Sequence, residues 1–139
     1  ALSEAMRLAS EVNKYLDQTA PWTAIKTDKT AAARSIYTAL VAIDSLKILL
    51  APFIPFSSES LHKIYNGQAP LFGTQSIETR ADKLGEHRVL RYDSSDATGS
   101  WEPSKLQPGQ KINPPAPLFR KLEPTIVDQE RARLGKPPA

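Results

Sequence analysis

The stretch NKYLDQTAPW, residues 13–22, separates two amphipathic patterns and places a Pro-Trp pair at the start of the second. Pro21 suits the first position of a helix, because the N–H that proline lacks would have no partner there. Trp22 therefore falls in the opening turn after a corner. It either packs between two helices, which is the more ordinary role, or stays exposed as a platform for a flat partner. A nucleic-acid base is such a partner, since base–aromatic stacking contributes about 1–3 kcal/mol.

The residues before this corner, 2–17, have the period of an amphipathic helix. Its predicted inward face carries apolar side chains at steps of three or four, namely Leu2, Met6, Ala9, Val12 and Leu16. Asn13 is in line with this face, and a buried amide without hydrogen-bond partners costs about 1–3 kcal/mol. The backbone of the loop at 18–20 can supply such partners. We therefore expect Asn13 to pin the corner, with a direct contact to a ligand as the alternative.

The residues after the corner predict three further helices, and the whole indicates a mainly α protein built on an antiparallel helical bundle. The predicted ranges are Pro21 to about Lys26, about Lys29 to Leu50 with an N-cap from Thr27 and Asp28, and about 58–66 with a cap from Ser57 and a stop at Asn66-Gly67. Pro52 ends the long helix, because proline cannot continue the backbone ladder. The apolar linker at 51–56 is expected to tuck its two phenylalanines into the bundle.

The second half of the chain is less regular, and we expect a β-hairpin within it. Strands are predicted at about 75–80 and 87–92, with residues 82–86 as the turn. Pro108-Gly109 indicates a further turn, residues 114–119 can only run extended, and a short polar helix is expected at about 125–134 with Gly135 as its stop. The expected parts are a bundle core at 1–67, an irregular excursion at 68–117 and a terminal segment at 118–139, in one domain overall.

Composition narrows the class of protein. A chain of 139 residues fits a single domain with a real core. Its 18 Lys and Arg against 15 Asp and Glu give a net charge of +3, which permits a nucleic-acid partner without demanding one. Without cysteine there is neither a disulfide nor a Cys-based zinc site, which fits a cytoplasmic location. No apolar run is long enough to span a membrane. The chain begins in mid-helix without an initiator Met, so we expect it to be part of a longer protein.

Catalytic patterns are missing from the sequence. The two histidines, His62 and His87, lie in different parts of the chain, and the six glycines form no phosphate-binding loop. Ser57-Ser58-Glu59-Ser60 lacks the Gly-x-Ser-x-Gly turn of a nucleophile elbow. We therefore expect no catalytic residue, no metal site and no cofactor site on this chain.

Three segments carry a resemblance to a known family. Residues 13–22, the run LLAPFIP at 49–55 and the run PLFRK at 117–121 resemble the C-terminal part of methionyl-tRNA synthetases, which are class I enzymes. The likeness covers about residues 2–135. The Asn-x-Tyr…Ala-Pro-Trp pattern occurs more loosely in other class I synthetases, whereas Pro108-Gly109 and the PLF run favour the methionine enzyme. The resemblance implies a helical domain that grips the anticodon stem and loop.

The resemblance also implies roles for individual residues. Trp22 corresponds to a tryptophan that stacks on the first anticodon base, and Pro21 to the proline before it. Lys14 and Lys26 lie within about two helical turns of the corner, where they either attract phosphates or only aid solubility. Two further reading residues of the family, an Asn and an Arg, belong to a helix that would precede this chain.

The implied partners are tRNA, both initiator and elongator methionine tRNA, and the catalytic domain of the same polypeptide. That missing domain would use ATP and methionine. The alternative from another class is a helical module that docks a protein, with the apolar linker at 51–56 and the Pro-rich tail as its interface.

Overall fold

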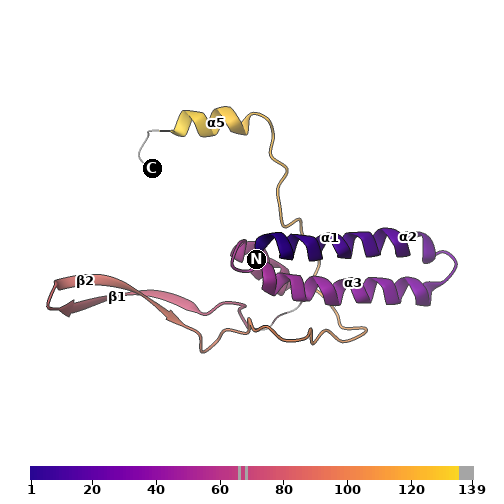
Figure 1. The fold of residues 1–139 in the computed structure, drawn as a ribbon, viewed down its shortest axis with the longest axis horizontal. Helices are drawn as coiled ribbons and strands as arrows, with labels where there is room; N and C mark the ends of the chain where they lie inside the picture. Colours follow the sequence, from indigo (N-terminus) through magenta and orange to yellow (C-terminus); the bar gives the residue numbers. More distant parts are fainter. Residues whose placement is uncertain (66, 68, 135–139) are drawn as a thin grey trace.

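The computed structural model describes residues 1–65, 67 and 69–134, and it has the predicted mainly helical architecture with a small antiparallel sheet (Figure 1). The elements in chain order are α1 (Leu2–Thr19), α2 (Pro21–Ala24), α3 (Lys29–Leu50), α4 (Pro55–Ile64), β1 (Thr74–Asp82), β2 (Gly85–Asp93) and α5 (Ile126–Arg133). Two predicted helix stops, Asn66 and Gly135, fall outside the described residues. No described helix is long and apolar enough to cross a membrane.

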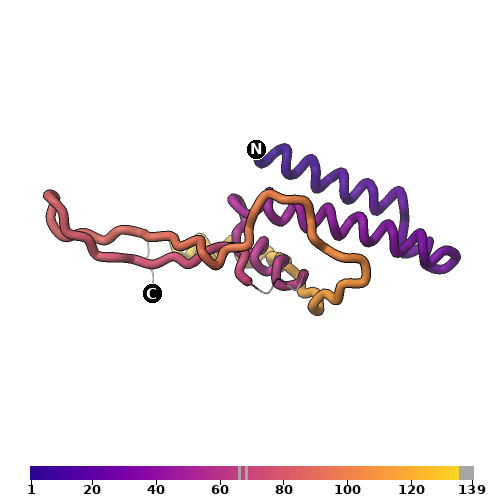
Figure 2. The backbone as a smooth tube through the Cα atoms, turned by 90° about the horizontal axis from the view of Figure 1, so that it is seen from below, coloured from indigo at the N-terminus to yellow at the C-terminus, as the bar shows by residue number. Residues whose placement is uncertain are grey.

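Helices α1 and α3 lie side by side and antiparallel, and they form the body of the bundle (Figures 1 and 2). The buried residues of these two helices are mostly small: Ala5 of α1, and Ala32, Ala39 and Leu46 of α3. Alanine at these positions lets two backbones approach closely. The long helix starts as predicted, because the Asp28 carboxylate accepts a hydrogen bond from the Ala31 N–H at 2.9 Å.

The start of α4 and the packing of the linker differ from the prediction. The helix begins at Pro55 instead of residue 58, because proline occupies its first turn without losing a hydrogen bond. Phe53 and Phe56 are 42% and 87% exposed, so the prediction that both enter the bundle is wrong. The inward face of α4 runs through Ser58 and Tyr65, seven residues apart, which turns Phe56 outward.

Some apolar side chains of α1 and α3 are exposed and lie outside the core. Leu2 and Met6, both predicted to face inward, are 46% and 53% exposed, and Ile36 of α3 is 43% exposed. Leu2 and Met6 lie on the same side of α1 as the exposed Asn13, whereas Ala5, in the same turn as Met6, is 4% exposed. Periodicity therefore predicted α1 correctly but drew its inward face about one position away from the observed one.

The predicted β-hairpin is confirmed and is longer than expected. Strand β1 pairs with β2 in antiparallel register, with Ile77 opposite Leu90 and Asp82 opposite Gly85. Gly85 has φ of 97°, which suits glycine in a tight turn. The hairpin projects beyond the bundle (Figure 2), and its strands are mostly exposed.

Residues 103–113, here called the strap, return from the hairpin and cross the bundle. The Tyr37 hydroxyl of α3 donates to the carbonyl of Leu106 at 2.9 Å, and the Asn113 N–H donates to the carbonyl of Ile64 at 2.8 Å. The Gln110 side chain donates to the carbonyl of Tyr65 at 3.0 Å. Leu106 is buried beneath these contacts. The strap thus covers one side of α3, while α5 lies away from the bundle (Figure 1).

Candidate nucleic-acid interface

The corner between α1 and α2 holds Trp22 on the surface. Ala20 adopts the left-handed conformation, with φ of 37° and ψ of 58°, and ends α1 with a 2.9 Å bond from its N–H to the carbonyl of Leu16. Its own carbonyl accepts the N–H groups of Thr23 and Ala24 at 2.8 and 3.0 Å. Pro21 is buried, whereas Trp22 is 58% exposed. A side chain so exposed is not a core plug, and its backbone is fixed on both sides.

Asn13 does not pin this corner. It is exposed on α1, and no hydrogen bond joins its side chain to residues 18–20 anywhere in the described chain. The prediction of a buried amide is wrong because the inward face of α1 runs through Val12 and Leu16, and Asn13 is turned about 100° from Val12. Backbone bonds close the corner instead, helped by a 2.8 Å bond from the Thr19 hydroxyl to the carbonyl of Tyr15.

The two candidate lysines differ in their surroundings. Lys14 lies 2.9 Å from Glu11, and this hydrogen bond holds the pKa of Glu11 below its usual value. Much of the Lys14 charge is therefore balanced within α1. Lys26 is exposed and forms no ion pair with any described residue. Of the two lysines, Lys26 is the better placed to attract a phosphate.

Sequence analysis missed two further cations near the corner, Lys29 and Arg34 at the start of α3. Both are exposed, and neither forms an ion pair within the described ranges. The sequence does carry a signal for them. Neither Lys26, Lys29 nor Arg34 has an acidic residue three or four positions away, whereas Lys14 has Glu11. Residues 20–34 thus carry three cations against one carboxylate, that of Asp28, which leaves this segment with a net charge of +2.

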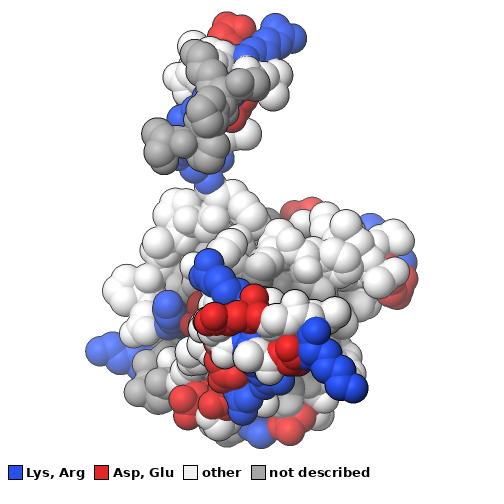
Figure 3. Space-filling model, turned by 90° about the vertical axis from the view of Figure 1, so that its left-hand side faces the viewer, with Lys and Arg blue, Asp and Glu red and all other residues white. Residues whose placement is uncertain are grey.

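The hairpin end offers no comparable charge. Acidic and basic side chains are interspersed on the face of the molecule that Figure 3 shows. Within the hairpin, Glu78 lies 3.3 Å from Arg91 and 3.6 Å from Arg80. Charges that are paired in this way leave little net attraction for a phosphate backbone.

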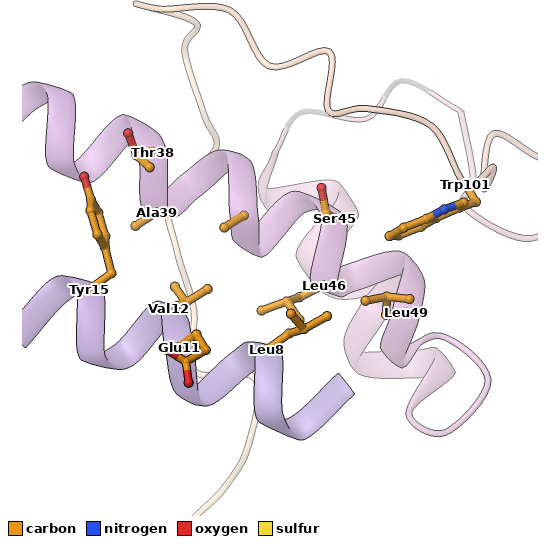
Figure 4. A pocket seen from close by; sticks show the side chains of 11 residues that line it. Leu8, Glu11, Val12, Tyr15, Thr38, Ala39, Ser45, Leu46, Leu49 and Trp101 are labelled. Carbon is orange, nitrogen blue, oxygen red and sulfur yellow. The ribbon is translucent and has the colours of Figure 1, made fainter. Parts of the chain in front are cut away.

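Two grooves run along α3. The first lies between α1 and α3, has a volume of about 320 Å³ and is almost wholly apolar. Figure 4 shows Trp101 reaching over its far end near Leu49, and this tryptophan is 67% exposed. The second groove has a volume of about 390 Å³ and lies between α3 and the strap, with Ile25 and Lys29 among its lining residues. Only the second groove therefore adjoins the charged corner.

A buried polar cluster joins α3 to α4 away from this corner. Lys47 is 6% exposed and lies 2.6 Å from Asp44 and 3.1 Å from Nδ1 of His62. Tyr65 donates to the carbonyl of Leu40 at 2.8 Å, and burial raises its pKa. Among the described residues no group of three His, Cys, Asp or Glu could hold a metal ion. Every member of the cluster has protein partners, which fits a structural role.

Comparison with known proteins assigns the chain to a family. Residues 3–91 match the family described as the anticodon binding domain of methionyl tRNA ligase. The chain belongs to this family. It is 48% identical to a methionine–tRNA ligase of Thermomicrobium roseum and 44% identical to one of Chloroflexus aurantiacus, over 96% of this chain in both cases. No solved structure matches the chain.

The anticodon-binding domain is a minor part of these relatives. The matched region covers 23% of the Thermomicrobium ligase and 22% of the Chloroflexus ligase. The more distant ligase of Thermobifida fusca, 37% identical, likewise matches over 23% of its length. The catalytic domain of a methionine–tRNA ligase is therefore absent from these 139 residues.

Proposed function

We propose that this domain binds the anticodon stem and loop of methionine tRNA, with Trp22 stacked on the first anticodon base. The observation that carries the proposal is a tryptophan, 58% exposed, on a corner whose backbone is fixed by Pro21 and Ala20. RNA-binding proteins recognise loops by splaying bases onto aromatic side chains. A platform that is already rigid loses little conformational entropy when the base arrives.

The residues around Trp22 have different roles in this proposal. Lys26 attracts the phosphates that flank the stacked base, supported by Lys29 and Arg34, which form no ion pair with the residues that the structure describes. Asn13 is exposed about two helical turns before the corner and offers an amide to a base edge or a phosphate oxygen. Lys14 contributes less, because Glu11 balances its charge. Pro21 acts on the fold of the corner, since it is buried and is the first residue of α2.

In the complete ligase this domain would position tRNA for the catalytic domain of the same polypeptide. That catalytic domain would use ATP and methionine, so the present chain would need no cofactor. The tRNA partners would be the initiator and elongator methionine tRNAs, and the enzyme would work in the cytoplasm. The domain's contribution to aminoacylation would be binding and orientation, not chemistry.

The salt dependence of binding distinguishes this proposal from the alternative, which is docking of a protein. The apolar groove beside Trp101 would suit such a protein partner. We expect the affinity of the ligase for an anticodon stem-loop RNA to fall steeply with salt, with a log–log slope of about −0.7 for each phosphate contacted. Three contacts from Lys26, Lys29 and Arg34 would give a slope of about −2. A flat salt response would contradict RNA binding through this corner and favour an apolar protein interface.

A further inference from the structure

We propose that the groove between α3 and the strap binds a second unstacked base of the same RNA loop, beside the base on Trp22. This inference rests on the proposed function, and it adds a base-binding groove that sequence analysis did not predict. The groove is the larger of the two along α3, at about 390 Å³, which is within the size range of small-ligand sites.

The walls of the groove are apolar and come from opposite sides. Helix α3 contributes Ala33 and Ile36, and the strap contributes Leu106 and Ile112. Ile36 is 43% exposed although it belongs to the apolar stripe of α3. Two apolar walls that face each other leave room between them for a planar ring, such as a base splayed out of an RNA loop.

The groove is fixed in shape by its own hydrogen bonds. The Tyr37 hydroxyl anchors the strap to α3 through the carbonyl of Leu106 at 2.9 Å. The strap then turns at Pro108-Gly109, where the Gln110 N–H donates to the carbonyl of Gln107 at 3.0 Å. Gly109 has φ of 79°, as the third residue of a type II turn requires. The groove thus exists before a ligand enters it.

Polar atoms are available at the open edge of the groove. The Gln107 side chain donates through Nε2 to the carbonyl of Lys105 at 3.1 Å, and nothing in the described chain donates to its Oε1. A Cβ at Gly109 would meet no atom within 4 Å, so the turn's backbone is open to an incoming group. These are the kinds of atoms that read the edge of a base.

Charge and position favour RNA as the occupant. Lys29 lines the groove, Lys26 and Lys111 flank lining residues, and no acidic residue lines it. Ile25, 49% exposed, contributes to the groove and lies three residues after Trp22 along a helical turn. Side chains three apart share a helical face, so the groove continues from the Trp22 platform. The groove between α1 and α3 has neither this charge nor this continuity.

The test fills the groove without touching Trp22. Ala33→Phe adds a ring to an exposed α3 position that lines the groove, and Ser3→Phe adds the same ring to an exposed position in the first turn of α1. The full-length ligase carrying each variant is titrated with an anticodon stem-loop RNA. We expect Ala33→Phe to weaken binding about tenfold, as for one lost base contact, and Ser3→Phe to leave it unchanged.

Abasic probes separate the groove from the platform. Each loop nucleotide is made abasic in turn, and the loss of affinity is measured for the wild type, Trp22→Ala and Ala33→Phe. We expect Ala33→Phe to abolish the penalty at one loop position and Trp22→Ala to abolish it at a different one. Ile36→Ser removes apolar surface from the groove instead of adding bulk. It should reduce the abasic penalty at the same loop position that Ala33→Phe affects.

Three results would overturn the inference. If Trp22→Ala weakens binding and Ala33→Phe and Ile36→Ser do not, the groove holds no base and the proposed function stands. If Ala33→Phe lowers the melting temperature of the ligase with an unchanged abasic profile, the groove packs protein. If the wild-type ligase binds the anticodon stem-loop of methionine tRNA no more tightly than an unrelated stem-loop, the proposed function fails, and this inference fails with it.

Discussion

The side-chain ammonium of Lys47 in α3 lies 3.1 Å from Nδ1 of His62 in α4. An ammonium can only donate, so Nδ1 accepts and the ring hydrogen is on Nε2, which donates to the carbonyl of Ala69 at 2.9 Å. The same ammonium pairs with Asp44 and lies 5.7 Å from the ring centre of Tyr65. His62 therefore connects a buried cation in the bundle to the segment that leads into the hairpin.

Removing the His62 ring should destabilise the protein. We expect His62→Ala to lower the free energy of unfolding by about 1–3 kcal/mol, because a buried ammonium loses an acceptor. Gly67→Ala should act in the same direction, since its Cβ would clash with the His62 ring. Urea denaturation measures both, with His87→Ala on the hairpin as the control. A loss for His62→Ala no greater than for His87→Ala would refute the structural role.

Tyr65 predicts how stability changes at alkaline pH. Burial, with Asp44 nearby, raises the pKa of Tyr65 above its ordinary value of 10.0. The folded state therefore favours the neutral phenol. The resulting stability is fully present below pH 10 and is lost as the pH rises from 10 toward the folded pKa. Over this range we expect Tyr65 to lower the free energy of unfolding by about 1.4 kcal/mol for each pH unit.

The matched variants are Tyr65→Phe and Tyr92→Phe. Tyr65→Phe should cost about 1 kcal/mol at neutral pH, because the bond to the carbonyl of Leu40 is lost. Above pH 10 its unfolding free energy should fall less steeply than that of the wild type. Tyr92→Phe, which removes a tyrosine hydroxyl from the exposed hairpin, is the control. Parallel pH profiles for the wild type and Tyr65→Phe would contradict a raised pKa.

The local parts of this fold could be predicted from sequence. The cap at Asp28 and the hairpin pairing around Ile77 and Leu90 each depend on residues close together in the chain. The strap could not be predicted, because the bond from Tyr37 to Leu106 joins residues 69 positions apart. No periodicity encodes such a contact. The outward turn of Phe56 was missed for a related reason, since it depends on where α4 begins.

The candidate site was only partly predictable. The Pro-Trp pair identified the corner, but Trp22's 58% exposure depends on how α2 packs on α3. Asn13 was misplaced because the inward face of α1 was drawn one position off, and a step of one residue turns a side chain by about 100°. The groove beside the strap was beyond sequence reasoning, since its walls come from residues about seventy positions apart, as Ile36 and Leu106 do.

Asn13→Ala should leave stability unchanged. Because the amide is exposed and free of hydrogen bonds to residues 18–20, we expect a change in unfolding free energy within about 0.5 kcal/mol. Ser3→Ala, at another exposed position of α1, is the control. If Asn13 contacts RNA, stem-loop affinity should fall while the denaturation midpoint stays constant. A loss of about 1–3 kcal/mol in stability would instead restore the view that Asn13 pins the corner.

Trp22→Ala should separate RNA binding from folding. In the full-length ligase we expect tRNA binding to weaken by about 1–3 kcal/mol, the contribution of one base stack. The denaturation midpoint should change little, because Trp22 is already 58% exposed. Trp22→Phe should recover part of the binding, since a smaller ring still stacks. Methionine activation, measured by pyrophosphate exchange, should be unaffected because that chemistry belongs to another domain.

The other tryptophan provides the control for this experiment. Trp101 is 67% exposed but lies over the apolar groove between α1 and α3, away from the unpaired lysines. Trp101→Ala removes the same side chain from the surface, and we expect it to leave tRNA affinity unchanged. If Trp22 were instead a core plug, Trp22→Ala would cost about 3–5 kcal/mol of stability. Such a loss of stability, together with unchanged tRNA affinity of the variant that remains folded, would rule out stacking. Trp22 would then serve only to pack the corner.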